Sequence, residues 1–262
     1  MWLDDEVPIH KREIVLDKPY LNAAGILGFT PNPHTMPFLH HLGAFLTNPI
    51  SQAPRQPAGN RAHISFHGGF LMHTGLVNPG IDRAIKKFKR RWANAPCPII
   101  IHLLVESPQG LNGTIKRLES LENILGVELG LPPNCQPDTL HSLLEAARGE
   151  LPIILSLSPE QIPNLLPTIL ESPDVPIHLA QPRGMLPNLE GRLVTGRFYG
   201  PAIFPIMLKA AKALVDEGIQ VIANGGITQS WQVKVLLDCG VLAVGLGSLL
   251  WNVETEVIFT DL

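Results

Sequence analysis

The chain contains little charge and little cysteine. Charged residues make up 16% of its 262 positions, against roughly 25% in typical soluble domains, so we expect much buried surface or an exterior partly hidden in an oligomer. A net charge of −3 gives no electrostatic reason to expect nucleic acid or an anionic membrane as a partner. The three cysteines, Cys97, Cys135 and Cys239, show no CxxC spacing, so neither a zinc ribbon nor a disulfide framework is indicated. Their odd number favours a reducing, intracellular setting.

Long apolar segments are also missing. The longest apolar run, around residues 99–105, is far shorter than the ~20 residues that cross a bilayer. The acidic N-terminus lacks the basic start and apolar stretch of a signal peptide, and we therefore expect a cytoplasmic protein. No GxGxxG follows the first strand-like run, which argues against the runner-up fold, an open doubly wound sheet.

Short runs rich in Ile, Val and Leu recur along the chain, and they are apolar on both faces, as in buried parallel strands. We predict strands at residues 20–24, 44–48, 98–105, 126–131, 152–157, 176–180, 220–223 and 241–245. Helical patterns fall between several of them, at residues 81–95, 113–123, 140–148, 159–170, 203–217 and 230–239. Eight strands alternating with helices predict an α/β protein, a TIM (β/α)8 barrel that forms a single domain over residues 1–262.

One long irregular stretch, residues 49–79, is rich in Pro, Gly and His. A loop of this length is usually functional or mobile, and we expect it to lie over the barrel mouth, where the loops after the strands build the active site. It contains His63, His67 and His73, and histidine suits proton transfer near neutral pH. His73 is the first candidate because it adjoins Gly75 and Leu76. His178, in the sixth run, faces either the site or the core.

Two glycine turns near the C-terminus predict a bound anion. Residues 223–227 (Ala-Asn-Gly-Gly-Ile) follow the seventh run and residues 244–248 (Val-Gly-Leu-Gly-Ser) follow the eighth. Glycine lets backbone N–H groups approach an anion closely, and barrels place a phosphate after strands seven and eight. Either turn alone would also need glycine for its geometry. Arg183 and Arg197 precede this end of the barrel and offer a charge-assisted contact to phosphate or to an acidic substrate.

Further motifs follow one another in a set order. They are Leu21-Asn22-Ala23-Ala24-Gly25, Gly43-Ala44-Phe45-Leu46-Thr47, Gly69-Phe70 with Gly75-Leu76-Val77-Asn78-Pro79-Gly80, Glu128-Leu129 with Pro133-Asn134, and Gly200-Pro201-Ala202-Ile203 with Pro205. In this order, and together with the glycine turns, they resemble the dihydroorotate dehydrogenases, particularly the soluble kind, over nearly the whole chain. The resemblance implies FMN as cofactor, a small-molecule substrate and, as often in the family, a homodimer.

The resemblance also implies roles for individual residues. The implied cofactor-binding residues are Ala23, Ala24, Gly25, Thr47, Asn48, Ser156, Gly200, Gly225, Gly226, Gly247 and Ser248. The implied substrate-side residues are Met72, Gly75, Leu76 and Asn78, and the catalytic candidates are Cys135, His73 and Asn134. Cys135 follows Pro-Asn three residues after the family's base position, and its alternative reading is an ordinary buried or loop thiol.

The chain departs from the family at the reacting end of the site. Asn48 and Ser156 stand where the family has two lysines, Pro132 stands at the position of the base, and Met72, Gly130 and Gln181 stand in place of asparagines that grip the substrate ring. Oxidation of dihydroorotate by the family mechanism is therefore not expected. Three hypotheses remain: an FMN-dependent oxidoreductase with an altered substrate, a non-catalytic barrel that binds FMN or another ligand, and a flavin-free enzyme that handles a phosphorylated metabolite.

Overall fold

Eight parallel strands form the barrel that the sequence predicts. The computed structural model describes residues 13–251 and residue 259. The barrel strands are β1 (Tyr20–Asn22), β2 (Phe45–Leu46), β6 (Ile99–Leu104), β7 (Ile124–Gly130), β8 (Ile153–Leu157), β9 (Ile177–Leu179), β12 (Val221–Asn224) and β13 (Ala243–Leu246). They are ordered β1-β13-β12-β9-β8-β7-β6-β2. A bridge between Leu21 and Ala44 brings the two ends of this order together. Each of the eight predicted runs overlaps one of these strands.

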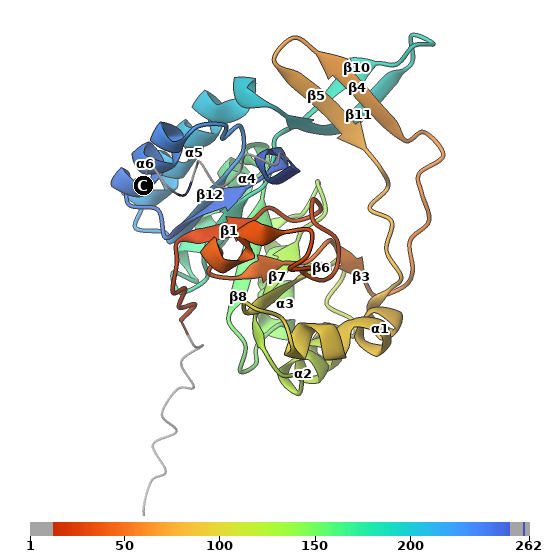
Figure 1. Ribbon diagram of the computed structural model, residues 1–262, viewed down its shortest axis with the longest axis vertical. Coiled ribbons are helices and arrows are strands. Elements are labelled where there is room, and N and C mark those ends of the chain that lie inside the picture. The colour runs from red at the N-terminus through yellow and green to blue at the C-terminus, as the bar shows by residue number, and fades with distance from the viewer. Residues whose placement is uncertain (1–12, 252–258, 260–262) are drawn as a thin grey trace, which may run out of the picture.

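Helices pack around the barrel between the strands (Figure 1). They are α1 (Ile81–Ala93), α2 (Leu111–Glu119), α3 (Pro137–Ala146), α4 (Ile162–Leu170), α5 (Phe204–Asp216) and α6 (Ser230–Asp238), with short 3-10 helices η1 (Pro37–His41), η2 (Pro159–Gln161), η3 (Pro201–Ile203) and η4 (Ser248–Trp251). Helix α1 shows the general pattern, because Ile81, Ala84, Phe88 and Trp92 recur at helical spacing and are all buried. The six predicted helical segments are confirmed.

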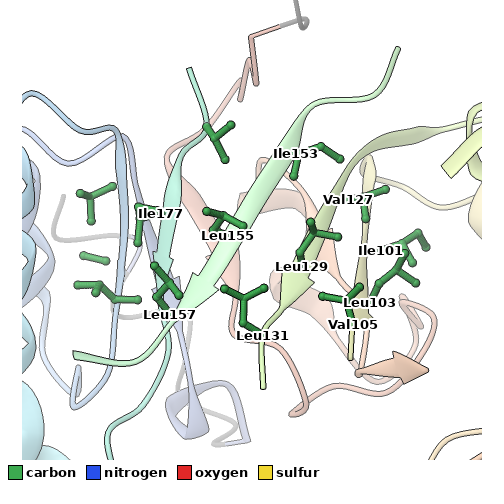
Figure 2. Packing of buried hydrophobic residues seen from close by; sticks show 14 of the residues in the cluster. Ile101, Leu103, Val105, Val127, Leu129, Leu131, Ile153, Leu155, Leu157 and Ile177 are labelled. Atoms are coloured by element: carbon green, nitrogen blue, oxygen red, sulfur yellow. The ribbon is translucent and has the colours of Figure 1, made fainter. Parts of the chain in front are cut away.

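The barrel strands bury both of their faces, in two different environments. Ile101, Leu103, Val127, Leu129 and Leu155 belong to the larger apolar cluster, which includes the buried faces of the helices (Figure 2). Alternate residues point to the barrel axis, where Leu21, Leu46, Ile100, Ile154 and Ile222 form a second, smaller cluster. This two-sided burial explains why the strands read as unbroken aliphatic runs.

A second sheet, which we call the outer sheet, stands apart from the barrel (Figure 1). Its four antiparallel strands are ordered β10 (Arg183–Pro187), β11 (Leu193–Tyr199), β5 (Gly69–His73) and β4 (Ala62–Phe66). The sequence did not predict this sheet. The stretch 49–79, which the sequence suggests is one long irregular loop, instead contains the hairpin β4–β5 and the short strand β3 (Ile50–Ser51), which pairs with β6.

Two glycines allow the tip of the β4–β5 hairpin to lie against the chain that leads into η3. A Cβ on Gly69 would come within 2.0 Å of the Tyr199 carbonyl oxygen. Gly200 has a φ of +125°, and a Cβ there would lie 2.5 Å from the Gly68 carbonyl oxygen. Neither position has room for a side chain, so the outer sheet is held close to the start of α5.

Candidate functional site

A cavity of about 570 Å³ opens at the carboxyl ends of the barrel strands. Its walls come from both sheets: Ala24, Asn48 and Gly130 follow or end barrel strands, and Met72 and Arg197 belong to the outer sheet. This volume lies within the range of ~300–1,000 Å³ that is usual for small-molecule sites, and the carboxyl end is where TIM barrels place them.

A buried carboxylate holds two histidines on the floor of this cavity. Glu128 of β7 is 1% exposed, His102 of β6 is 5% exposed and His178 of β9 is 2% exposed. Nδ1 of His102 lies 2.6 Å from Oε1 of Glu128, and Nδ1 of His178 lies 2.6 Å from Oε2. Strand register explains the meeting, because His102 and Glu128 are direct partners across β6 and β7. All three residues line the cavity.

The electrostatics of Glu128 follow from this arrangement. Burial raises the pKa of the Glu128 carboxyl, but the charges of His178 and His102 and the hydrogen bonds from both rings outweigh burial and hold that pKa well below its usual range. Glu128 is therefore an ionised acceptor, and each imidazole donates its Nδ1–H to it. The Nε2 atom of each ring is left for another partner.

Two glycines provide the room that the imidazoles fill. A Cβ on Gly130 would lie 2.4 Å from Nε2 of His102, and a Cβ on Gly245 would lie 2.8 Å from Nε2 of His178. Gly130 is one of the positions where the resemblance implies an asparagine. The imidazole of His102 occupies space beside Gly130 that a longer side chain at this position would need.

Several predicted cofactor residues surround the same cavity. Ala24, Gly25, Asn48 and Ser156 line it. Asn48 is held against the loop after β1, since its Oδ1 accepts a hydrogen bond from the Gly28 N–H at 3.0 Å. Ala23 and Thr47 are buried beside the cavity rather than in its lining, and the Thr47 hydroxyl accepts from the His102 N–H at 3.1 Å.

The glycine turns lie outside the residues that line the cavity. Gly225, Gly226, Gly247, Ser248 and Gly200 are absent from its walls, although the neighbouring Asn224 is present. Gly225 and Gly226 both have positive φ, and a Cβ on Gly226 would lie 2.5 Å from the backbone nitrogen of Phe204, the first residue of α5. The turn therefore needs glycine to approach this helix start, and its role in binding phosphate stays a prediction.

The structure separates the predicted catalytic residues. His73 lines the cavity and its Nε2 lies 3.2 Å from Oδ1 of Asn60. Cys135 and Asn134 are not among the lining residues, whereas Pro132 and Pro133 are. Burial raises the pKa of the Cys135 thiol, which disfavours the reactive thiolate.

Of the predicted substrate-side residues, Met72, Gly75 and Leu76 line the cavity and Asn78 does not. The Asn78 side chain instead holds a turn: its Oδ1 accepts hydrogen bonds from the backbone N–H groups of Ser51 and Gly80.

Positive charge gathers at one wall of the cavity. Arg183 and Arg197 are direct partners across β10 and β11, and both line the cavity. Among the described residues, neither forms a salt bridge with a carboxylate, and Arg197 donates to the Gln181 carbonyl oxygen at 2.9 Å. Burial and the charge of Arg197 lower the pKa of Arg183. The charge of nearby Glu160, whose Oε1 accepts from the Arg183 backbone N–H at 3.2 Å, opposes this lowering. Two guanidinium groups at one wall, without a salt bridge among the described residues, favour an anionic ligand.

Sequence reasoning missed His102 and the role of Glu128, and it left His178 open. The sequence did contain a signal, because each of these polar residues interrupts an aliphatic run. Side chains two residues apart share one face of a strand, and this face points to the barrel axis. Ile100, His102 and Leu104 share one face of β6, and Gly126, Glu128 and Gly130 share one face of β7. Their convergence on one carboxylate depends on strand register, which a single sequence does not show.

Known proteins resemble the chain both in sequence and in fold. The catalytic subunit of dihydroorotate dehydrogenase B (NAD(+)) from Geobacter metallireducens is 26% identical over 90% of this chain and 84% of its own length. The subunit of the same name from Saccharolobus solfataricus is 24% identical over 94% of this chain and 89% of its own length. The crystal structure of DHODH from Eimeria tenella in complex with ferulenol superposes with a TM-score of 0.75 at 14% identity, covering 99% of this chain and 84% of that one. No family model matches the chain.

Proposed function

Because this chain is a divergent relative of the dihydroorotate dehydrogenases, we propose that it is an FMN-dependent oxidoreductase that acts on a small molecule other than dihydroorotate. The observation that carries the proposal is the cavity at the carboxyl end of the barrel, whose wall includes Ala24 and Gly25 and whose floor holds Glu128 between two histidines.

The described residues fit a flavin at this place. Ala24, Gly25, Asn48 and Ser156 would hold it, and its phosphate would lie toward the glycine turns at Gly225 and Gly247. Nε2 of His178 is a buried polar atom without a hydrogen-bond partner among the described residues, which indicates that the floor is built to meet a polar ligand. Bound FMN would supply two-electron chemistry.

The change of substrate is supported by what lines the reacting end of the cavity. Pro132, which lines the cavity, stands where the resemblance implies a base, and the proline side chain has no group that accepts a proton. Arg183 and Arg197 add two cations at the opposite sheet, which favours a substrate with a carboxylate or phosphate group. The chain's own residues would therefore bind and orient an anionic substrate, and a group other than residue 132 would accept or donate the proton.

A visible spectrum of the freshly purified protein, with mass analysis of any small molecule released on denaturation, tests this proposal. A yellow protein that releases FMN and is bleached by at least one donor from a panel of small organic acids supports it. A colourless protein that added FMN does not restore would overturn it. Cytoplasmic localisation and a homodimer remain part of the proposal, and light scattering during gel filtration tests the dimer.

A second function, a non-catalytic barrel that binds FMN or a phosphorylated ligand, is supported by one observation. No lysine is among the residues that line the cavity. The two positions where the resemblance implies lysines next to a reduced flavin are the uncharged Asn48 and Ser156, and the arginines Arg183 and Arg197 lie on the outer sheet instead. Bound FMN that no donor in the panel reduces, but dithionite does, would favour this second function.

A further inference from the structure

Both imidazoles on the cavity floor present a nitrogen without a protein partner. Nε2 of His178 is buried and forms no hydrogen bond with the described residues. The hydrogen bonds of His102 are made by its backbone N–H and its Nδ1, which leaves its Nε2 unpartnered as well in the part of the chain that the structure describes. Such atoms are rare in protein interiors unless water or a ligand meets them.

The number of protons on the two rings sets the net charge of the floor. With Glu128 ionised, two neutral imidazoles give a net charge of −1, one imidazolium gives zero and two give +1. Uptake of one proton at either Nε2 therefore removes an uncompensated charge, which is costly away from water.

The other polar groups around the floor do not neutralise this site. Ser156 of β8 and Asn224 of β12 line the cavity and are uncharged. The charged or titratable residues elsewhere on the cavity wall are Arg55, His73, Glu106, Arg183, Arg197 and Tyr199. Arg55 is paired with Glu106 at 3.1 Å. Among the described residues, none of these wall groups forms a salt bridge with Glu128, His102 or His178.

We propose that Glu128, His102 and His178 form a buried acid–base site in which the Nε2 atoms exchange a proton with a small ligand that carries a carbonyl, hydroxyl or ring-nitrogen group. Glu128 is the positioning residue: it keeps the proton of each neutral ring on Nδ1, so that the Nε2 lone pair faces the ligand, and its charge stabilises the imidazolium.

The proton step balances without any further reactant. A ligand O–H, N–H or C–H bond breaks, its electron pair stays on the ligand, and the proton forms an N–H bond at Nε2. The ring becomes an imidazolium beside Glu128, and the reverse step returns the proton. The site thus supplies a proton acceptor, which Pro132 at the family's base position cannot. It rests on the chain's own residues and does not require the proposed flavin.

Nuclear magnetic resonance of the full-length protein with ¹⁵N-labelled histidine tests the site, because two-bond ¹H–¹⁵N spectra show which ring nitrogen carries the proton. Signals are assigned with His102→Gln and His178→Gln. At alkaline pH, with both rings neutral, we expect each ring to carry its proton on Nδ1, because Glu128 accepts a hydrogen bond from the Nδ1 of both.

Glu128→Gln supplies the decisive variant and Glu106→Gln its control, since Glu106 also lines the cavity but contacts neither histidine. We expect Glu128→Gln to move the proton of one neutral ring from Nδ1 to Nε2, because the amide accepts from one imidazole through its oxygen and donates to the other through its NH2 group. Glu106→Gln should leave both rings with the proton on Nδ1. Protons on Nε2 in the neutral rings of the wild type, or equal tautomer patterns in the two variants, would overturn the proposal.

Adding FMN separates this proposal from the proposed function. FMN that binds and shifts the Nε2 signal of either histidine supports both. FMN that binds while both signals stay unchanged overturns the placement of the acid–base site at the ligand. A protein that binds no FMN overturns the proposed function, while the tautomer spectra in the absence of ligand still decide the acid–base site.

Discussion

Replacing Gly130 with alanine measures how firmly the histidines on the cavity floor are fixed. The added Cβ would lie 2.4 Å from Nε2 and 3.0 Å from Cε1 of His102, and 3.3 Å from Cδ2 of Leu104. A contact below 3.0 Å forces a shift. His102 cannot yield freely, because its Nδ1 is held 2.6 Å from Glu128, which also holds His178.

The expected cost follows from these contacts. Overpacking a tight interior costs typically about 1–3 kcal/mol, and losing a hydrogen bond to a charged group adds about 1.5–3 kcal/mol if the ring is pushed away from Glu128. The φ of Gly130 is not in the positive range, so the backbone tolerates alanine and the cost is steric. We expect Gly130→Ala to lower the free energy of unfolding by about 2–4 kcal/mol.

Urea unfolding followed by circular dichroism measures this change, and Gly113→Ala is its matched control. Gly113 lies in α2, is exposed, and a Cβ there meets nothing within 4 Å. Alanine is favoured over glycine in helices by about 0.5–1 kcal/mol, so the control should be stabilised. Replacing glycine with alanine should therefore lower the free energy of unfolding at position 130 and raise it at position 113. A neutral or stabilising Gly130→Ala would refute the placement of His102.

The remaining predictions concern Glu128, the arginine pair and the flavin. Glu128→Ala should lower the free energy of unfolding at pH 7 by about 3–5 kcal/mol in urea titrations, because two imidazoles lose their buried acceptor, whereas Ala in place of the exposed Glu106 should change it little. Because folding lowers the pKa of the Glu128 carboxyl, its contribution to the free energy of unfolding is complete above the ordinary pKa of 4.5 and is lost as the pH falls further. Between about pH 5 and pH 3, the free energy of unfolding should therefore fall less steeply with decreasing pH in Glu128→Gln than in the wild type. Arg183→Gln should stabilise the ligand-free protein by about 0.2–1 kcal/mol at low salt, because it removes a like charge directly opposite Arg197, whereas Arg192→Gln, at the exposed end of the same hairpin, should have almost no effect. If FMN is bound, its reduction potential should lie below that of relatives that keep both lysines. Ser156→Lys should raise this potential by roughly 20–40 mV, equivalent to about 1–2 kcal/mol for two electrons. An unchanged potential in a redox titration would contradict this electrostatic reasoning.

Aliphatic patterning was enough to locate the barrel. Runs such as residues 152–157 are buried on both faces, and this is the one environment in which a strand reads as unbroken Ile and Leu. The outer sheet carries no such pattern. Its strand β4 alternates between half-buried and exposed residues, and β5 pairs with β11 from a distant part of the chain, so local sequence holds little information about it.

Part of the cavity wall could be located from the sequence. Ala24 and Gly25 belong to the motif after the first strand, and Asn48, Ser156 and His73 were singled out by position; all five line the cavity, while their roles stay predictions. The floor depends on register instead, because His102 meets Glu128 only through the pairing of β6 with β7. A charged residue inside an aliphatic run was the available signal, and Glu128 was read only as part of a family motif.

The outer sheet has a consequence for how this protein diversifies. Strands β4 and β5 belong to the chain segment that follows β2 and β3, and β10 and β11 belong to the segment that follows β9. The pairing of β11 with β5 joins these two segments. Exchanging one segment between relatives would leave a strand edge without its matching partner, so we expect the two segments to be inherited and to vary together. To transfer a ligand preference from one relative to another, both segments would have to be exchanged, and the barrel would not need to change.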